Sequence, residues 1–378
     1  MSSMSTQNSE TRIFRAPGRV NLIGEHTDYN DGFVMPVALN FSTWATVSPL
    51  APRKLQIFSE NFNEHVEIDL DDKNLARRGH WSDYPIGVAV VIERAGYRLR
   101  GAKLHLRGEV PIGSGLSSSA AVEVATACAL VANSGLHIDE RELARLCQRA
   151  ENEFVGARVG IMDQFVSLFG QAHKALLLDC RSLEFRLLPV PDNVRLIICN
   201  TMVKHELASS AYNERRAQCE AGAKHLNVAA LRDAGLEQLE EHRNGMPEVV
   251  FRRCRHVITE NARVLAAGET LEQVDLNRFG KLMAESHRSL RDDYEVSSDE
   301  LDLMVELAQH VEGVYGARMT GGGFGGCTIN LVRTENVEEF RARVTEGYER
   351  VTNFKPEIYI TTAANGAEEI FEPQMNAN

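Results

Sequence analysis

Three segments that lie far apart in the sequence contain glycines, and two of them add small hydroxyl residues or carboxylates. They are Gly18–Tyr29, Pro111–Ala121 and Gly321–Gly326. The first supplies carboxylates and a histidine, which suit a hydroxyl-rich substrate. The second supplies small residues and hydroxyls directly before a predicted helix, which suits a phosphate, and the third supplies a backbone that can approach a ligand closely. Together the three segments indicate parts of one phosphate-transfer site.

The second segment has the features of a phosphate-binding loop. The unpaired amides at the N-terminus of a helix favour an anion by roughly 0.3–1 kcal/mol at an exposed site. Glycines at positions 113 and 115 let the backbone come close to phosphate oxygens. The segment is not a Walker A loop, because the sequence contains no Gly-x-x-x-x-Gly-Lys-Ser/Thr. A serine-capped helix after a flexible loop is the alternative that these residues leave open.

The first segment crowds Glu25, His26, Asp28 and Tyr29 together. A calcium loop is excluded, because its glycine would come one place early and Leu39 stands where the bidentate glutamate belongs. A plain polar turn remains possible. Carboxylates accept paired hydrogen bonds from neighbouring hydroxyls, and their fixed geometry can separate sugar epimers. Sugar recognition is therefore the functional interpretation of this segment.

The third segment fits the dinucleotide fingerprint Gly-x-Gly-x-x-Gly at positions 321, 323 and 326. That fingerprint must follow a strand and open a helix. Here the residues that follow, Cys327–Val332, predict a strand, so we reject a dinucleotide site. A glycine-rich hairpin between two strands is the remaining structural interpretation.

Taken together, these motifs resemble those of the galactokinase branch of the GHMP small-molecule kinases, from about Arg12 to Thr361. Ser286–Ser297 adds to the resemblance, although Asp299 replaces a proline that is usual in the family. The resemblance implies an α+β fold of two domains. The N-terminal domain would have a mixed sheet like that of ribosomal protein S5, the C-terminal domain would be α/β, and the active site would lie in the cleft between them.

The resemblance also implies which residues bind MgATP. Ser119 and Glu151 would hold Mg²⁺, which prefers oxygen ligands and keeps several waters. Trp81 and Tyr84 would lie beside the adenine, with core packing as the alternative for both. The remaining residues implied to bind ATP are Pro111, Ile112, Gly113, Ser114, Gly115, Leu116, Ser117, Ser118, Ser119 and Ala120.

The implied reaction moves the γ-phosphoryl group of ATP to the C1 hydroxyl of α-D-galactose. The resemblance places Glu25 and His26 near the C6 hydroxyl, and Asp28 at the C3 and C4 hydroxyls with the help of Tyr212. Asp163 matches the catalytic aspartate of the family and Arg19 matches the arginine beside it. A carboxylate within hydrogen-bond reach of a sugar hydroxyl can accept its proton, and a neighbouring arginine keeps that carboxylate ionised. A helix N-cap is the alternative role for Asp163.

Other activities compete with this interpretation. A kinase for N-acetylgalactosamine or L-arabinose would differ in the pocket wall that faces C2 and C6. A non-catalytic regulator that binds galactose and ATP is a rival from another class. Such sensors lose residues from the Ser-Ser-Ser-Ala-Ala run, whereas Ser117–Ala121 is complete in this chain. The sequence therefore favours an enzyme.

Hydrophobic periodicity predicts the elements that carry these residues, with a domain boundary near Asn200 that divides the chain into 1–200 and 201–378. Asp139 is the expected N-cap of one helix. The predicted strands are Arg12–Arg15, Phe33–Leu39, Thr43–Ser48, Leu55–Phe58, His65–Leu70, Lys103–Arg107, Ala175–Leu178, Val194–Asn200, Cys327–Val332 and Glu357–Thr361. The predicted helices are Trp81–Ala95, Ser119–Asn133, Asp139–Val155, Ser210–His225, Val249–Ala267, Asn277–Leu290, Asp299–Val311 and Val337–Tyr348.

Composition limits the partners of the chain. Its 378 residues carry a formal net charge of −12, which argues against nucleic acid as a main partner. The seven cysteines are scattered without a CxxC pair, which is typical of a reduced, intracellular protein without structural zinc. No secretory signal or membrane-spanning run is recognisable. We therefore expect a cytoplasmic protein. The resemblance to galactokinases implies galactose and ATP as its partners, and we expect a monomer.

Overall fold

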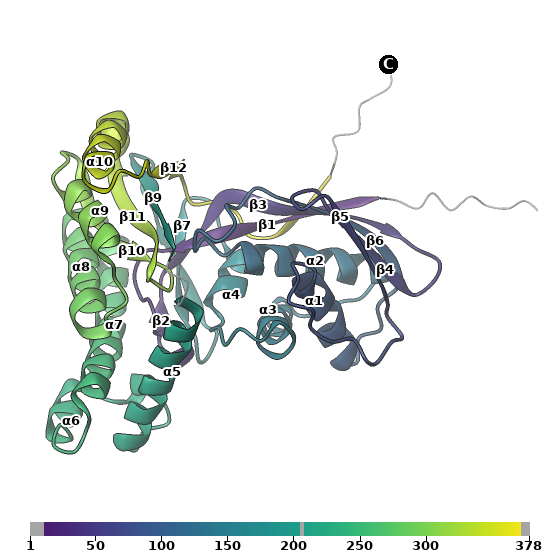
Figure 1. Cartoon of the computed structure of the whole chain (residues 1–378), viewed down its shortest axis with the longest axis horizontal. Coiled ribbons are helices and arrows are strands. Elements are labelled where there is room, and N and C mark those ends of the chain that lie inside the picture. The colour runs from purple at the N-terminus through teal and green to yellow at the C-terminus, as the bar shows by residue number, and fades with distance from the viewer. Residues whose placement is uncertain (1–10, 205–207, 372–378) are drawn as a thin grey trace, which may run out of the picture.

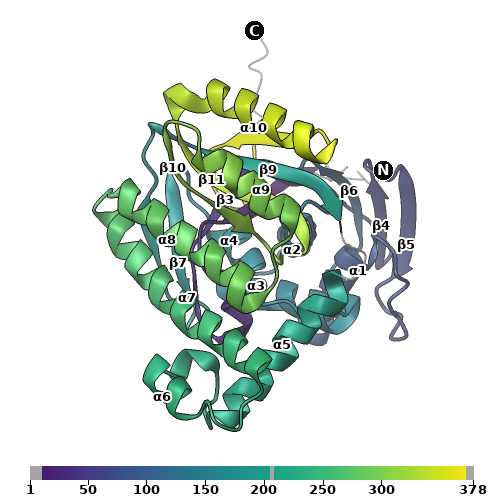
Figure 2. The same ribbon diagram turned by 60° about the vertical axis from the view of Figure 1, so that its left-hand side comes forward.

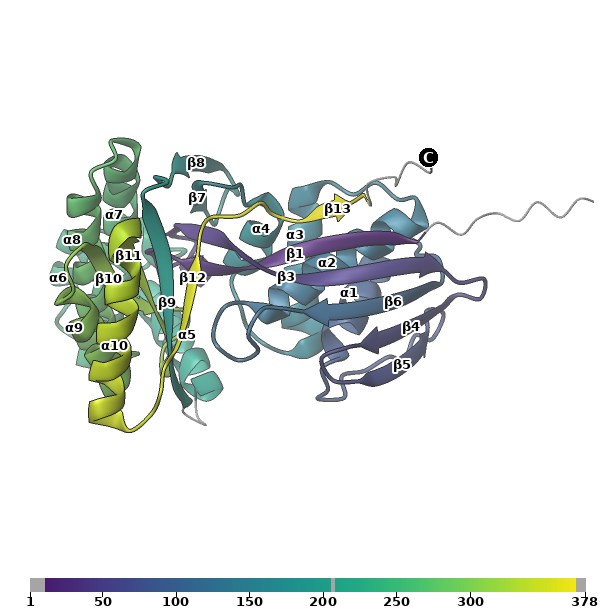
Figure 3. The same cartoon turned by 90° about the horizontal axis from the view of Figure 1, so that it is seen from above.

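Two lobes lie side by side, as Figure 1 shows for this computed structural model, which describes residues 11–204 and 208–371. The first lobe is built on a six-stranded sheet with the order β13-β1-β3-β6-β4-β5, in which β4 and β6 pair in parallel and the other neighbours are antiparallel. Figure 3 shows this order from above. The strands are β1 (Arg12–Asn21), β3 (Pro36–Pro49), β4 (Lys54–Ser59), β5 (Glu64–Asp69), β6 (Ala102–Gly108) and β13 (Glu368–Ile370).

Helices cover one face of this sheet (Figure 1). They are α1 (Asp83–Arg94), α2 (Ser118–Ser134), α3 (Glu140–Arg149) and α4 (Met162–Phe169). Asp139 caps α3 as predicted, since its side chain accepts from the amides of Arg141 and Glu142. After α3 the chain continues as a π-helical turn, Ala150–Val155. π-Helical turns are rare, but those that occur are often found at functional sites. This one carries Glu151.

The second lobe contains a four-stranded antiparallel sheet with the order β10-β11-β9-β12, covered by long helices (Figure 2). Its strands are β9 (Val194–Lys204), β10 (Val314–Thr320), β11 (Gly325–Arg333) and β12 (Glu357–Thr361). Its helices are α5 (Ala208–His225), α6 (Leu236–Glu241), α7 (Glu248–Glu272), α8 (Leu276–Ser289), α9 (Asp299–Gln309) and α10 (Val337–Thr352). A second π-helical turn, Leu290–Tyr294, follows α8.

A small third sheet, with the order β2-β7-β8, lies beside the junction of the lobes. It consists of β2 (Phe33–Val34), β7 (Lys174–Asp179) and β8 (Phe185–Pro189). One apolar cluster includes Val20 and Val37 of the first sheet and Ile198 and Ile329 of the second. The lobes therefore share a core.

The predicted α+β architecture is confirmed, and each predicted element overlaps an observed one. One prediction was wrong: most of Phe33–Leu39 and all of Thr43–Ser48 belong to the single strand β3, which pairs with β1 on one side and β6 on the other. This pairing on both sides keeps the residues between them extended. The sequence did not predict β8, β13, α4 or α6, and it implied β10 only as the first strand of a glycine-rich hairpin, without bounds.

The chain crosses between the lobes more than once. β9 runs through residue 200, where the domain boundary was predicted, and β13 returns to pair with β1. In the part of the chain that the structure describes, no helix has the length and apolar character needed to span a bilayer.

Candidate active site

Ser117, at the N-cap position of α2, bonds Asp163 instead of capping the helix. Ser117 has a left-handed backbone (φ 60°) and makes no N-cap hydrogen bond. Its Oγ donates to Oδ2 of Asp163 at 2.5 Å. A non-glycine residue in this conformation costs about 1–3 kcal/mol, and such residues cluster at functional sites. The position is therefore strained, and the bond that accompanies the strain is one to the predicted catalytic carboxylate.

Asp163 and Arg19 form a two-pronged ion pair. Nε and Nη2 of Arg19 donate to Oδ1 and Oδ2 of Asp163, both at 2.8 Å. The third nitrogen, Nη1, donates to the carbonyl of Gly115 at 2.6 Å, so one guanidinium joins the phosphate loop to the carboxylate. Asp163 does not cap α4, because the cap position is occupied by Ile161. The alternative role as an N-cap is thereby excluded.

Two cavities meet at this ion pair. The larger, which we call the large cleft, has a volume of about 470 Å³. The smaller, which we call the small pocket, has a volume of about 120 Å³. The residues that line both are Arg19, Val159, Asp163 and Gly322. Ligands in the two cavities would therefore face each other across Asp163 and Arg19.

The phosphate loop forms one wall of the large cleft. The predicted residues that line it are Ile112, Gly113, Gly115, Ser117, Ser118 and Ser119. The other predicted residues of the loop, Pro111, Ser114, Leu116 and Ala120, do not line the cleft, and the last three are buried. Ser114 donates to the carbonyl of Pro111 at 2.7 Å, which holds the loop together from behind.

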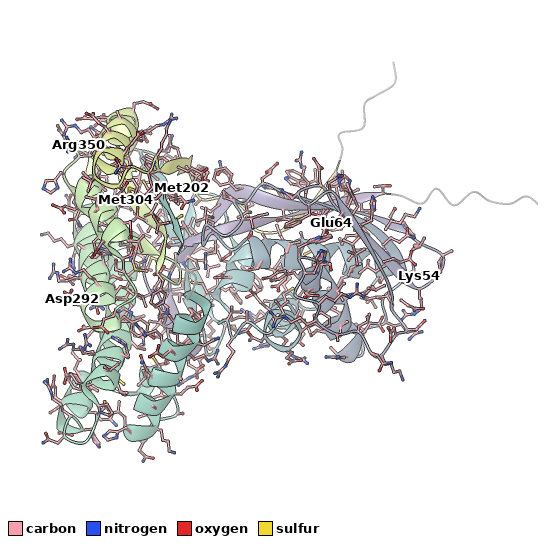
Figure 4. All side chains as sticks on the ribbon, in the orientation of Figure 1. Lys54, Glu64, Met202, Asp292, Met304 and Arg350 are labelled. Carbon is pink, nitrogen blue, oxygen red and sulfur yellow. The ribbon has the colours of Figure 1, made fainter. Side chains whose placement is uncertain are left out.

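Aromatic side chains also line the large cleft. The rings of Phe62 and Trp81 are parallel within 5°, with centroids 5.5 Å apart, and Tyr84 also lines this cleft. The indole of Trp81 donates to the carboxylate of Glu64 at 2.8 Å. Glu64 is labelled in Figure 4 on the first lobe. Phe62 was not predicted, although an apolar ring among the polar residues between β4 and β5 was an available signal.

A buried group of oxygen ligands lies beside the phosphate loop. Ser119 and Glu151 both line the large cleft. Gln164 donates to Glu151 at 2.7 Å and to Glu123, one helical turn beyond Ser119, at 3.0 Å. Burial raises the pKa of Glu151 to about 7 and that of Glu123 well above its usual value.

This group fits a magnesium ion. Oε1 of Glu123 and Oε1 of Gln164 are buried without a hydrogen-bond partner. A hydroxyl and a carboxylate are donors that Mg²⁺ takes, and Ser119 and Glu151 present them to the cleft, which Glu123 and Gln164 do not line. Among the described residues no group of three or more acidic, histidine or cysteine side chains is placed to hold a metal ion. The sequence did not predict Glu123, because α2 is otherwise small and apolar.

The small pocket is lined by side chains that can bond hydroxyls. Asp28, Tyr212 and Asp163 all line it. Burial, together with the charge of Asp163, raises the pKa of Asp28 to about 6. Gly160 is required beside Asp28, because a Cβ there would come within 1.9 Å of its Oδ2. The pocket can thus present an acidic acceptor next to the Asp163–Arg19 pair.

Glu25 lines the same pocket but is extensively bonded within the protein. Its carboxylate forms a buried ion pair with Arg318 at 2.6 Å. It also accepts from Asn21, from Thr320 at 3.1 Å and from the amide of Gly321 at 3.0 Å. Only 2% of the side chain is exposed. Glu25 therefore joins β1 to the end of β10 across the lobes, and a contact with a sugar remains a prediction.

His26 also lines the small pocket, with a left-handed backbone (φ 64°). Its Nδ1 lies 2.8 Å from the hydroxyl of Tyr29, and its Nε2 lies 3.2 Å from the carbonyl of Gly322. Burial lowers the pKa of His26 to about 3, so the ring is neutral. The contact between His26 and the C6 hydroxyl of the sugar stays a prediction.

The third glycine segment joins β10 to β11 as an antiparallel hairpin, which confirms the hairpin interpretation and the rejection of a dinucleotide fold. Gly321 and Gly322 line the small pocket. Gly323 has φ 82°, and a Cβ there would lie 2.2 Å from the carbonyl of Val296. Glycine is thus needed where this loop, which we call the glycine loop (Gly321–Phe324), approaches the chain after α8.

Comparisons with protein families agree with this site. The model of the GHMP kinases N terminal domain matches residues 83–171, and that of the GHMP kinases C terminal domain matches residues 269–350. The galactokinase galactose-binding signature matches residues 4–49, which include the carboxylates of the first segment.

Individual proteins are similar over nearly the whole chain. A galactokinase of Roseiflexus sp. (strain RS-1) is 44% identical over 95% of this chain and 93% of its own length. A galactokinase of Chloroflexus aggregans is 46% identical over 96% of this chain and 94% of its own. The crystal structure of Lactococcus lactis galactokinase complexed with galactose superposes with a TM-score of 0.92 at 38% identity, covering 96% of this chain and 95% of that one. A mevalonate kinase, at 18% identity and a TM-score of 0.67, shares the fold.

Proposed function

Because this chain belongs to the galactokinase family of the GHMP kinases, we propose that it transfers the γ-phosphoryl group of MgATP to the C1 hydroxyl of α-D-galactose. The products are galactose 1-phosphate and ADP. The observation that carries the proposal is the meeting of the two cavities at Asp163 and Arg19. Galactose occupies the small pocket and ATP the large cleft, so that donor and acceptor face each other.

Asp163 is the general base of this reaction. Oδ2 accepts from both Arg19 and Ser117, whereas Oδ1 accepts from Arg19 alone. Oδ1 is therefore the oxygen with a lone pair left for the C1 hydroxyl. As the C1 oxygen bonds to the γ-phosphorus, its proton passes to Asp163 and the bond from that phosphorus to the oxygen of ADP breaks.

Arg19 has two tasks. Its charge keeps Asp163 ionised, and its bond to the carbonyl of Gly115 fixes the phosphate loop relative to the base. The positive charge also offsets negative charge that spreads over the transferring phosphoryl group. One residue thus aligns the acceptor and the donor.

Ser119 and Glu151 would hold Mg²⁺, with Glu123 and Gln164 supporting Glu151 from behind. When bound, the ion neutralises charge on the phosphates of ATP. Phe62 and Trp81 would pack against the adenine ring. This proposal is supported by the stacking of the two rings in the lining of the large cleft.

On the sugar side, Asp28 and Tyr212 are the groups that bond hydroxyls of galactose. Asp28 must be ionised to accept two hydroxyl donors, and with a pKa of about 6 it is ionised at neutral pH. We expect the enzyme to act as a monomer in the cytoplasm. Seven free thiols support a reducing compartment.

The test is product formation by the purified chain. Galactose, ATP and Mg²⁺ are incubated with the protein and followed by ³¹P NMR. The proposal expects galactose 1-phosphate and ADP to appear together in equal amounts, with neither formed when galactose or Mg²⁺ is left out. Hydrolysis of ATP without a sugar phosphate, or no reaction at all, would refute it.

A further inference from the structure

A line of hydrogen-bonded side chains ends at the carbonyl of Gly322, which lines both cavities. It starts at the thiol of Cys219 on α5, which lies 3.1 Å from the hydroxyl of Tyr294. That hydroxyl lies 2.7 Å from the hydroxyl of Tyr29, which in turn lies 2.8 Å from Nδ1 of His26. We call these four side chains, with the Gly322 carbonyl, the tyrosine–histidine chain.

The carbonyl of Gly322 fixes the direction of every hydrogen bond in the chain. A carbonyl only accepts, so Nε2 of His26 carries the proton. Nδ1 of the neutral ring then accepts from Tyr29. Tyr29 has no second proton, so Tyr294 donates to it, and the thiol of Cys219 donates to Tyr294. Each donor and acceptor has a single consistent role.

The chain is anchored firmly at Tyr294. This ring is fully buried and lies between two imidazoles, with centroids 4.7 Å from His26 and 4.5 Å from His256. Arg215 donates to the backbone carbonyl of Tyr294 at 2.7 Å. Tyr294 also ends the π-helical turn that follows α8. The second lobe thus holds one end of the chain, while the glycine loop lies at the other.

Two other hydrogen bonds hold the glycine loop to this region. The amide of Gly321 donates to the carboxylate of Glu25 at 3.0 Å, and the amide of Phe324 donates to the carbonyl of Val296 at 2.7 Å. Those bonds fix the two ends of the loop, whereas the bond from His26 fixes Gly322, the residue between the cavities. Loss of the chain would therefore free the carbonyl of Gly322 while both ends of the loop stay bonded.

We propose that Tyr29 and Tyr294 are positioning residues, which act through His26 to hold Gly322 at the boundary between the two cavities. The role assigned to them in catalysis depends on the proposed function, whereas the hydrogen-bond direction does not. A misplacement of about 1 Å can lower turnover by about 10²-fold, so the loop must be held closely. On this account the imidazole of His26 supports the loop as well as lining the sugar pocket.

The first test is spectroscopic and needs no activity. Long-range ¹⁵N–¹H NMR of the unliganded protein reports which ring nitrogen of each histidine is protonated. We expect His26 to carry its proton on Nε2 in the parent protein, and a share of the Nδ1–H form to appear in Tyr29→Phe. A parent His26 protonated on Nδ1 would overturn the proposal, even if galactose is phosphorylated.

The second test compares kinetic constants of Tyr29→Phe and Tyr294→Phe. We expect kcat to fall on the order of tenfold in Tyr29→Phe and less in Tyr294→Phe, with both KM values raised less than kcat is lowered. Tyr348→Phe is the matched control, because its hydroxyl is also buried and bonds the carbonyl of Thr201 at 2.8 Å. If both variants kept the kcat of Tyr348→Phe, a structural role would be sufficient and the proposal would fail. A parent without activity would refute the proposed function and leave the NMR test intact.

Discussion

The two cavities are built by different means. The large cleft is lined by the glycines and serines of the phosphate loop and by aromatic rings. The small pocket is about a quarter of its volume and is lined by Arg19, Asp28, Asp163 and other polar or charged side chains. Backbone amides recognise any phosphate, whereas carboxylates in fixed positions distinguish one hydroxyl arrangement from another.

This difference indicates how the work is divided. We propose that the large cleft supplies binding and charge neutralisation, and that the small pocket supplies specificity and the base. Changes in the small pocket should therefore alter which sugar reacts and how fast. Changes in the large cleft should alter the requirement for nucleotide and metal.

The largest effect should come from the substrate itself. A site built to bond an axial C4 hydroxyl rejects an analogue that misplaces it by a factor on the order of 10⁴ in kcat/KM. We expect glucose to be turned over that much more slowly than galactose, with the KM for ATP similar in both assays. A coupled assay of ADP release across a panel that includes N-acetylgalactosamine and L-arabinose measures this. Equal turnover of glucose and galactose would contradict the assignment of the small pocket.

A change in the proposed magnesium site should affect metal and nucleotide binding in the large cleft, but not galactose binding. Glu151→Gln and Ser119→Ala should raise the Mg²⁺ concentration needed for half-maximal activity by roughly 10–100-fold and lower kcat, because each removes an oxygen donor. Galactose affinity, measured by calorimetry, should stay within about twofold of the parent value. Magnesium titrations that overlay those of the parent would show that the ion is held elsewhere.

Asp28→Asn should raise the stability of the folded protein and weaken galactose binding. The pKa of Asp28 is about 6 in the folded protein, compared with 3.8 for an aspartate side chain in water. The folded state therefore holds the proton more tightly, so unfolding free energy falls as pH rises from about 4 to 6 and stays lower above that. Asn carries no charge, and the variant should be more stable than the parent by roughly 1–3 kcal/mol at pH 7.5 and equally stable near pH 4.

Denaturant unfolding at both pH values measures this gain. The same variant should lose most of its galactose affinity, since Asn has only one acceptor oxygen. A variant that is less stable than the parent at pH 7.5 would contradict the cost of burying the charge of Asp28. A variant that binds galactose normally would contradict the role of Asp28 as a sugar ligand.

The smallest effect is expected from the aromatic side chains that line the large cleft. Phe62→Ala should raise the KM for ATP by about threefold to tenfold, because an aromatic contact contributes about 0.5–1.5 kcal/mol beyond its buried area. The KM for galactose should not change. Phe354→Ala is a suitable control, since that ring is also exposed and lies after α10, where it lines neither cavity. Equal KM values for ATP in the two variants would exclude Phe62 from the nucleotide site.

Sequence patterns predicted the parts of the site that depend on local chemistry. The turn and helix start around Gly113–Ser119 are local features, and the structure has both. The pairing of Arg19 with Asp163 spans 144 positions, and only the family resemblance implied it. No periodicity links a residue on β1 to one at the start of α4.

Other features could not be predicted because they depend on long-range packing. Glu123 stands in an apolar helix, and its partners Gln164 and Glu151 come from elements that lie next to α2 only in the folded chain. Tyr294 joins Tyr29 across 265 positions. The sequence predicted two strands where the structure has the single strand β3. Pairing with β1 and β6 on both sides keeps the polar residues of β3 extended, and local propensity does not reveal that pairing.

The central claim is that Asp163 lies between the proposed galactose and ATP sites and acts on the chemical step instead of on binding. The most direct test is Asp163→Asn, with galactose and MgATP binding measured separately by calorimetry and phosphoryl transfer followed in a single turnover. We predict that both ligands bind with affinities near those of the parent, while transfer slows by roughly 10²–10⁴-fold because the proton acceptor is lost. Transfer at nearly the parental rate would contradict the account, and so would the loss of either ligand from a variant that is still folded.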